Sequence, residues 1–267
     1  MEAPVGLVAG EGKGPLILVK ALKSKGREVV AVAFSDEQAA RLEEAGARVA
    51  CLRLGQFGKL LKTFRGAGVR EVCLLGKVEK PRALREALPD LRALLLWKRL
   101  ASRNDDALLR EVCREFEKEG LRVVSPADLL PELLTPEGVL TRKAPSKEEW
   151  EDIRFGLSLA REIGRLDIGQ CVVVKDRMVV AVEAMEGTDE TIRRAGRLRQ
   201  GAVVVKVMKP NQDPRLDLPA AGADTVRVMQ EAGARVLALE AGRSLLFERE
   251  EALRLAEEAK ISIVGVS

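Results

Sequence analysis

Short β-rich runs alternate with stretches of helical spacing along this chain, and that alternation restricts the possible folds more than any other feature. Runs of Val, Ala and Leu are each followed by a segment whose apolar residues recur every three or four positions. This order is typical of a parallel sheet with helices on its faces, so we expect an α/β protein. In the first half the expected strands are 5–9, 29–34, 48–52, 70–75 and 122–124, and the expected helices are 16–24, 37–45, 57–64, 82–88, 91–100, 105–119 and a short one near 128.

A proline-rich stretch near the middle of the chain indicates a boundary between two domains. Residues 131–145 contain three prolines and a glycine, which favour an irregular linker. Ser146 follows, with Glu149 three residues later, the pattern of a capping box at a helix start. Beyond it the expected strands are 171–174, 179–183, 203–207, 235–238 and 261–266, and the expected helices are 148–163, 189–198, 225–231 and 249–258. The prediction is an N-terminal domain over 1–130, a linker over 131–146 and a C-terminal α/β domain over 147–267.

The chain has no histidine, which excludes several kinds of active site. Ser–His–Asp triads, Cys–His dyads and His-ligated zinc are all impossible. Any hydrolysis must therefore depend on carboxylates, lysines, arginines and backbone amides, with or without a hard cation.

Charge and cysteine content restrict the partners and the compartment. A net charge of +4, with only 3% aromatic residues and no tyrosine, does not indicate a nucleic-acid partner. The four cysteines are scattered without a CxxC pair, which is typical of buried thiols in a reducing compartment. The amino terminus begins with a strand rather than a signal peptide, and no apolar run reaches the roughly 18 residues of a membrane span. We expect a cytoplasmic protein.

A glycine-rich turn follows the first expected strand, with Gly10, Gly12 and Gly14 ahead of Pro15. Its GxGxG spacing departs from the GxGxxG of dinucleotide-binding turns, and Lys13 lacks the following Ser or Thr of a P-loop. The turn is either purely structural or a contact for a phosphate or nucleotide at a helix N-terminus. NAD binding is the least favoured interpretation.

Four carboxylates lie in the turn between an expected strand and helix, over 183–190. Thr188 suits an N-cap, and Asp189 suits the positive end of the helix dipole. Those preferences do not explain Glu183, which ends an otherwise apolar strand. With Arg193 and Arg194 one turn later, the cluster is either a surface network or a diphosphate and metal site.

Residues 206–219 combine three prolines with alternating charges. In an extended run Asp213, Arg215 and Asp217 project to the same side, after Lys206 and Lys209. Two carboxylates and an arginine on one face are suited to phosphoryl transfer, holding a cation or a water and neutralising phosphate oxygens. A solvated charged loop is the alternative.

These segments resemble the LpxI-type UDP-2,3-diacylglucosamine pyrophosphatases of lipid A biosynthesis. The resemblance is carried by Leu-Asp-Ile-Gly-Gln at 166–170, Glu-Ala-Met-Glu-Gly-Thr-Asp at 183–189, and Lys-x-x-Lys-Pro-x-Gln-Asp-x-Arg-x-Asp-Leu-Pro at 206–219. Supporting segments in the first half are 55–59, 76–81 and 105–110. Gly14 stands where the family usually has Leu, and Asn104 stands where Gly is expected.

The resemblance implies a Rossmann-like N-terminal domain and Mg2+-dependent (or Mn2+-dependent) hydrolysis of UDP-2,3-diacylglucosamine to UMP and 2,3-diacylglucosamine 1-phosphate (lipid X). The family's catalytic aspartate corresponds to Asp213 or Asp217. The expected catalytic residues are Asp213, Asp217, Glu183 and Asp189, and the expected metal ligands are Asp213, Asp217 and Glu186. The expected substrate-binding residues are Gly10, Gly12, Gly76, Lys77, Gln170, Thr188, Arg193, Arg194, Lys206, Lys209, Gln212 and Arg215. A non-catalytic nucleotide-lipid carrier and an NAD-dependent oxidoreductase are the alternatives, and a homo-oligomer is left open.

A basic, leucine-rich stretch suggests weak contact with the inner membrane surface. Residues 77–103 hold eight basic and three acidic side chains. A helix there would present Leu94 and Trp97 beside Lys98, Arg99 and Arg103, as interfacial helices do. A helix packed on its own domain is the alternative.

Overall fold

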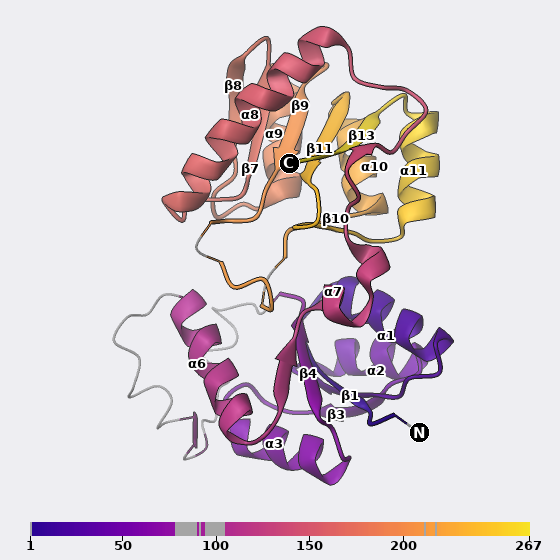
Figure 1. The fold of residues 1–267 in the computed structure, drawn as a ribbon, viewed down its shortest axis with the longest axis vertical. Coiled ribbons are helices and arrows are strands. Elements are labelled where there is room, and N and C mark those ends of the chain that lie inside the picture. Colours follow the sequence, from indigo (N-terminus) through magenta and orange to yellow (C-terminus); the bar gives the residue numbers. More distant parts are fainter. Residues whose placement is uncertain (1, 78–89, 91, 94–104, 211, 217) are drawn as a thin grey trace. The chain divides into compact units, whose positions relative to one another are not determined.

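The computed structural model describes residues 2–77, 90, 92–93, 105–210, 212–216 and 218–267, and Figure 1 shows its elements. The chain forms two compact units, Met1–Pro131 with Asp213–Asp217, and Glu132–Gln212 with Leu218–Ser267. The α/β class and the two-part organisation predicted from the sequence are confirmed. The expected helices over 82–88 and 91–100, and nearly all of the basic stretch, lie outside the described residues.

The first unit is built on a five-stranded parallel sheet in the order β3-β2-β1-β4-β5. The order reverses between β1 and β4, the arrangement of a Rossmann-like sheet. Its central strands are buried on both faces, as parallel strands covered by helices are. The strands are β1 (Val5–Ala9), β2 (Val29–Ala33), β3 (Arg48–Cys51), β4 (Glu71–Leu75) and β5 (Arg122–Val124).

Helices cover both faces of this sheet. The rings of Phe57 and Phe64 on α3 lie 5.3 and 6.4 Å from the ring of Phe116 on α6, and this cluster packs on Val72. Figure 1 shows α1 and α2 together on the other side of the sheet. The helices are α1 (Gly14–Ser24), α2 (Asp36–Glu44), α3 (Phe57–Gly66), α6 (Asp105–Lys118) and α7 (Pro126–Leu129).

The second unit holds a six-stranded mixed sheet in the order β6-β13-β11-β9-β7-β8. β9, β11 and β13 run parallel, whereas β7 is antiparallel to both of its neighbours. A separate short ribbon joins β10 (Ala220–Ala221) to β12 (Leu245–Leu246). The six strands are β6 (Gly138–Val139), β7 (Cys171–Lys175), β8 (Met178–Val182), β9 (Val203–Lys206), β11 (Val236–Glu240) and β13 (Ser262–Val266).

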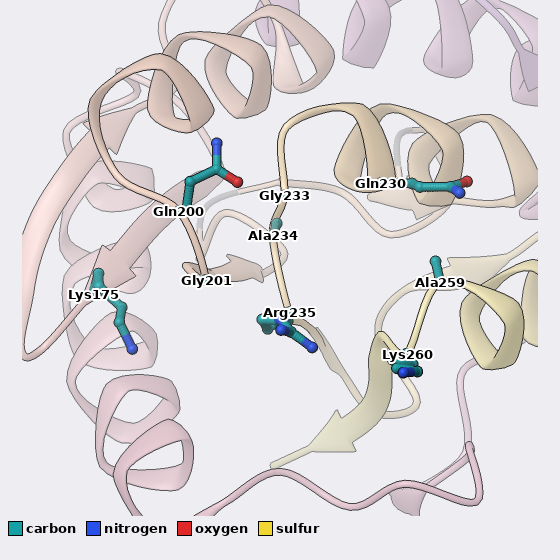
Figure 2. Close-up of a pocket in the computed structure, with 9 residues that line it drawn as sticks. All are labelled: Lys175, Gln200, Gly201, Gln230, Gly233, Ala234, Arg235, Ala259 and Lys260. Atoms are coloured by element: carbon teal, nitrogen blue, oxygen red, sulfur yellow. The ribbon is translucent and has the colours of Figure 1, made fainter.

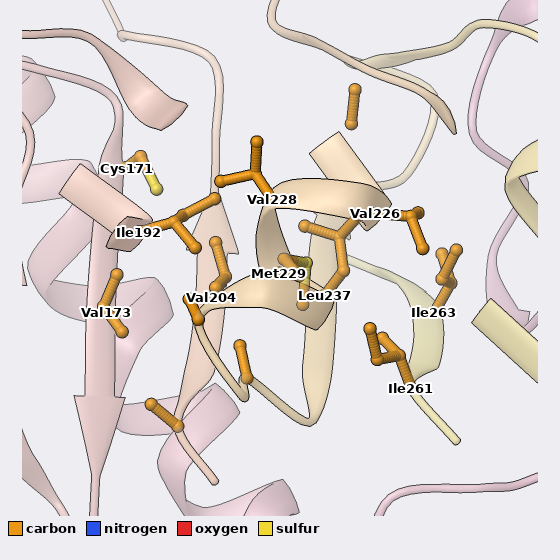
Figure 3. Packing of buried hydrophobic residues seen from close by; sticks show 14 of the residues in the cluster. Cys171, Val173, Ile192, Val204, Val226, Val228, Met229, Leu237, Ile261 and Ile263 are labelled. Carbon is orange, nitrogen blue, oxygen red and sulfur yellow. The ribbon is translucent and has the colours of Figure 1, made fainter. Parts of the chain in front are cut away.

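Two apolar cores hold the helices of this unit on opposite faces of the sheet. α8 (Lys147–Arg165) packs Ile153 on the valines of β7 and β9. α9 (Thr188–Leu198), α10 (Ala223–Glu231) and α11 (Arg249–Glu258) cover the other face, where Ile192, Met229 and Leu237 interdigitate (Figure 3). Each such buried side chain contributes roughly 1.5–3 kcal/mol of transfer free energy. No helix among the described ranges is long and apolar enough to span a bilayer.

The stretch expected to be a linker, 131–146, belongs to the second unit from Glu132 onward, and part of it forms a strand. After a 3-10 turn (Pro131–Leu133), β6 pairs with the edge of β13 through Val139 and Val264. A composition rich in proline does not reveal this pairing, because the partner strand lies more than a hundred residues away. The predicted capping box is confirmed: Ser146 Oγ accepts from Glu149 N at 3.2 Å, and Glu149 Oε2 accepts from Ser146 N at 2.8 Å.

A buried aspartate on α8 holds the turn between β7 and β8. Asp176 and Arg177 have φ values of 54° and 57°, a left-handed backbone that favours glycine. Asp152 accepts from Asp176 N at 3.0 Å and from Arg177 N at 2.6 Å. These charge-assisted bonds offset the strain of a two-residue turn without glycine.

Candidate functional site

Charged side chains gather at one edge of the second unit's sheet. β8, β9 and β11 end at this edge, and the antiparallel β7 begins there. Cys171, the first residue of β7, pairs with Lys206, and its carbonyl accepts from Glu183 N at 2.9 Å. Glu240 is the last residue of β11. Carboxyl ends of strands are where α/β proteins usually bind ligands.

Glu183 is buried and its two carboxylate oxygens are both engaged. Only 7% of the residue is exposed. Its Oε1 accepts from Thr188 Oγ1 at 2.8 Å, and its Oε2 accepts from Gln170 N at 3.2 Å. The structure therefore brings together three of the residues predicted for the site. The side-chain Oε1 of Gln170 is buried and has no hydrogen-bond partner among the described residues.

Gly187, rather than Thr188, is the N-cap of α9, so the predicted capping role of Thr188 is wrong. Gly187 has a φ of 82°, a conformation that threonine adopts only with strain. Thr188 is consequently the first residue of the helix, and its hydroxyl is directed to Glu183 instead of the helix end.

The other acids and arginines of this region form exposed ion pairs. Arg194 donates to Glu186 at 2.7 Å and to Val182 O at 2.9 Å. Hydrogen bonds from backbone amides and from Arg194 hold the pKa of Glu186 below its usual range. Arg193 pairs with Glu190 at 2.6 Å. Asp189 is exposed in the first turn of α9, close enough to raise the pKa of the Cys171 thiol, which burial raises most.

Two lysines follow along β9 and its extension. Lys206 is 7% exposed, and its ammonium donates to Ala220 O at 2.8 Å. Lys209 is paired with Asp167 at 2.8 Å. Gln212 is buried, and its backbone N–H donates to Lys209 O at 3.1 Å. The structure thus places Lys206 at the sheet edge with Glu183, and Lys209 on the polypeptide that follows.

Asp213 and Arg215 belong to the first unit, where they form a tight pair. Arg215 donates to Asp213 through its backbone N–H at 3.0 Å and through its guanidinium at 2.7 Å, and it also reaches Glu117 on α6 at 2.8 Å. Leu216 packs on the apolar cluster beneath. The Arg215 guanidinium holds the pKa of Asp213 below its usual range, and the pair raises the pKa of Arg215.

The described part of this segment is a turn, so the expectation of an extended run is wrong. Leu216 N donates to Asp213 O at 3.0 Å, closing the turn. Asp213 and Arg215 meet through their ion pair rather than through strand alternation. Asp217 lies outside the described residues.

The glycine-rich turn of the first unit is bound to the loop that follows β4. Glu11 and Lys77 exchange backbone hydrogen bonds of 2.7 and 3.0 Å. A Cβ on Gly10 would lie 2.6 Å from the backbone of Gly76, so this close approach requires glycine at both positions. Gly12, with a φ of 106°, has open space around it. These loops leave the two strands between which the sheet order reverses, where ligands of such folds bind.

A buried amide supports the same turn. The Nε2 of Gln38 donates to Gly10 O and Gly12 O, each at 3.0 Å, from a fully buried position on α2. Ser35 donates to Glu11 at 2.7 Å. The turn is therefore fixed by protein contacts, which gives its glycines a structural role whether or not a ligand is bound.

No group of three or more Asp, Glu or Cys side chains is placed to hold a metal ion within the described ranges. The carboxylates of Glu186 and Asp213 are each paired with an arginine. A carboxylate has about four acceptor positions. Glu186 uses three of them, for Ala184 N, Thr191 Oγ1 and Arg194, and so retains capacity for a further ligand. Asp213 accepts four contacts from Arg215, so a cation there would have to replace part of this pairing.

A pocket of about 610 Å³ lies at the opposite edge of the second unit's sheet, away from Glu183. Figure 2 shows the side chains that line it, among them Lys175, Arg235 and Lys260. α10 and α11 end at this edge, and cations near helix carboxyl termini are stabilised by the helix dipoles. The pocket is thus separate from the predicted site.

Both halves of the chain match models of one protein family. Residues 4–133 match the LpxI N-terminal domain, and residues 136–264 match the LpxI C-terminal domain. The chain belongs to the LpxI family. A curated relative, the UDP-2,3-diacylglucosamine pyrophosphatase LpxI of Caulobacter vibrioides, is 38% identical over 277 residues, which cover 98% of this chain and 97% of the relative.

Among solved structures, the glycotransferase of kitacinnamycin matches 97% of this LpxI chain and 91% of its own, with 13% identity and a TM-score of 0.27. A likeness this weak supports no conclusion.

The LpxI motif at 166–170 has a local explanation. A Cβ on Gly169 would lie 2.1 Å from Glu183 O, so only glycine lets this turn pack against the backbone of Glu183. The motif thereby aligns the N–H of Gln170 with the Glu183 carboxylate.

Glu240, a buried carboxylate at the same edge of the sheet as Glu183, was not identified from the sequence. Its side chain is buried and accepts from Met208 N at 3.0 Å. The sequence does contain a pattern that could have identified it: Glu240 ends an apolar strand, just as Glu183 directly follows one. Only the sheet order shows that the two strand ends lie at the same edge.

Proposed function

We propose that this chain hydrolyses the diphosphate of UDP-2,3-diacylglucosamine to UMP and 2,3-diacylglucosamine 1-phosphate, a step of lipid A biosynthesis. Water adds to one phosphorus, the bridging P–O bond breaks, and the second phosphate leaves. The observation that carries the proposal is the 38% identity to the Caulobacter pyrophosphatase over nearly the full length of both chains.

Residues of both units are assigned to this reaction as part of the proposal. On the second unit, Glu183 and Asp189 act as catalytic carboxylates, with Thr188 and Gln170 fixing Glu183. On the first, Asp213 or Asp217 orients the attacking water. The residues proposed to contact substrate are Gly10, Gly12, Gly76, Lys77, Gln170, Thr188, Arg193, Arg194, Lys206, Lys209, Gln212 and Arg215.

The lysines and arginines among these residues have a clear chemical role in the proposed reaction. A diphosphate gains negative charge on its oxygens as the bridge breaks, and lysines and arginines stabilise that charge. Lys206 is suited to this because it is buried, where a charge acts more strongly than in water.

Mg2+ or Mn2+ forms part of the proposal. Mg2+ is commonly held by one or two carboxylates together with substrate phosphates, and not by a full cage of protein ligands. That mode is compatible with described carboxylates that form no group of three. Asp213, Asp217 and Glu186 are the proposed ligands, and the cation would offset charge on the phosphate oxygens.

The decisive experiment is UMP release from UDP-2,3-diacylglucosamine by the purified chain, with and without EDTA. We expect release with added Mg2+ and its loss in EDTA, and we expect Asp213→Ala or Asp217→Ala to reduce the rate by about 100-fold or more. Full activity in both variants would contradict the assignment of the aspartates. Binding of the substrate without UMP release would favour a carrier. Tight binding of NADH would favour an oxidoreductase.

We further propose a cytoplasmic protein that contacts the inner membrane surface weakly, because its substrate carries two acyl chains. Support comes only from the sequence of the basic stretch over 77–103. Co-sedimentation with anionic vesicles tests this: binding should fall at high salt and in a variant with Lys98, Arg99 and Arg103 changed to Gln. Binding that is absent or independent of salt would contradict it. Light scattering tests whether the chain forms a homo-oligomer.

A further inference from the structure

Residues 207–219 leave the six-stranded sheet after β9 and return to the second unit at the separate strand β10. The segment follows β9, its residues 213–217 group with the first unit, and the chain re-enters at β10. Both candidate catalytic aspartates lie on it. The way its ends are held in the second unit therefore constrains the segment that carries them.

Two buried ionisable side chains hold the ends of this segment. Glu240 Oε2 accepts from Met208 N at 3.0 Å and so fixes the outgoing end. Lys206 Nζ donates to Ala220 O at 2.8 Å and so ties the last residue of β9 to the returning end. Glu240 is 4% exposed and Lys206 is 7% exposed, so these bonds are shielded from water.

Glu240 is itself fixed by its surroundings. Arg161 on α8 donates to its Oε1 at 3.3 Å, and the hydroxyl of Ser244 donates to its backbone O at 2.7 Å. Arg243 lies farther away, at 3.7 Å. A buried carboxylate is costly unless its charge is paired and its oxygens accept hydrogen bonds. Glu240 meets both conditions, because Arg161 pairs with its charge at Oε1 and its Oε2 accepts from the backbone N–H of Met208.

We infer that Glu240 is a positioning residue for the hydrolysis, an inference that rests on the proposed function. Its carboxylate fixes Met208 and, through it, the course of the backbone at Lys209 and Gln212, which leads to Asp213. Glu240 does not touch the substrate in this scheme. A shift of about 1 Å in a reacting group can change a rate by about 100-fold, so a lost anchor at the base of the segment acts mainly on kcat.

The experiment compares Glu240→Ala, Glu240→Asp and Glu240→Gln with Glu251→Gln on α11, which is paired with Arg254 and does not contact Glu240, as the matched control. UMP release gives kcat and KM, and hydrogen exchange of the peptide around Met208, without substrate, reports the anchor directly. We expect Glu240→Ala to lower kcat roughly 10- to 100-fold with little change in KM, and to speed exchange at Met208. Glu240→Gln still offers an acceptor oxygen, so it should keep most of kcat and the slow exchange.

Glu240→Asp keeps the charge but is one methylene shorter, so it should also speed exchange at Met208 and lower kcat. If the alanine variant does not fold, this variant tests the inference in its place. Wild-type kcat in either shortened variant would overturn the inference. So would a glutamine variant as impaired as alanine, or a loss of kcat without faster exchange. If the wild type releases no UMP, the proposed function fails, whereas the exchange measurement still tests whether Glu240 holds Met208.

Discussion

Replacement of Glu183 separates its charge from its structural contacts. In Glu183→Gln the new amide keeps the size of the side chain. Its oxygen still accepts from Gln170 N, and the Thr188 hydroxyl rotates so that it accepts from the new NH2 group. We expect the free energy of unfolding to change by less than about 1 kcal/mol, because both contacts persist.

Glu183→Ala removes both contacts and leaves the partly buried N–H of Gln170 and the hydroxyl of Thr188 without their acceptor. A hydrogen bond to a charged group contributes about 1.5–3 kcal/mol, so the two together amount to about 3–6 kcal/mol. That is a large share of the roughly 5–15 kcal/mol that stabilises a typical domain. The alanine variant should therefore be clearly less stable in urea than the glutamine variant.

The two Glu183 variants should differ in stability but not in activity. If the negative charge of Glu183 serves the reaction, both variants lose UMP release by about 100-fold or more, which corresponds to about 2.7 kcal/mol of transition-state free energy. Glu251→Gln, on the exposed face of α11, is the matched control and should retain wild-type activity. A glutamine variant with near-normal UMP release would refute the catalytic role, and one as unstable as alanine would refute the hydrogen-bond argument.

Three further predictions concern the hairpin, the pH profile and the thiols. Asp152→Ala should destabilise the second unit by about 3 kcal/mol or more, because two charge-assisted bonds to the β7–β8 turn are lost; urea unfolding measures this, with Asp152→Asn expected to lie between. The pKa of Asp213 is held low by Arg215, so the stabilisation from this pair is present above the ordinary carboxyl range and is lost as pH falls through the lowered pKa. Arg215→Gln should therefore move the acid limb of the kcat/KM profile to higher pH, and an unmoved limb would exclude Asp213 as the titrating group. Cys51 is exposed, although partial burial and the neighbouring Asp36 raise the pKa of its thiol. Burial raises the pKa of the Cys113 thiol to about 12 and also raises those of Cys73 and Cys171, and these three side chains are buried, so Ellman's reagent should label Cys51 alone until the protein is unfolded.

The sequence predicted the strands well because most of them are buried on both faces. Such strands appear as continuous runs of Val, Ala and Leu, for example 203–205 and 236–239, and helices between them show amphipathic spacing. β6 was not predicted from the sequence, because Gly138 and Val139 are exposed and have no apolar pattern. Their strand conformation comes from pairing with β13, which is a tertiary contact and not a local preference.

The candidate site was predicted in its residue types but not in its geometry. The acids around 183–190 stood out because an apolar strand ending in Glu is unusual. Which atom each acid binds depends on backbone details that the sequence does not show. Because Gly187, with its positive φ, is the N-cap of α9, Thr188 is the first helical residue and its hydroxyl donates to Glu183. The turn at Asp213 depends on contacts with α6, far away in the sequence.

The grouping of residues 213–217 with the first unit has a consequence for how the halves of such a chain can be exchanged. By sequence these residues fall in the C-terminal family domain, 136–264, yet Arg215 is paired with Glu117 of the N-terminal one. A chimaera joined near residue 135 from two relatives would combine an α6 from one parent with a 213–217 segment from the other. Such hybrids should therefore keep this ion pair only when the two parents carry matching partners at 117 and 215, and because the pair is partly exposed its loss should lower their stability by no more than about 1 kcal/mol.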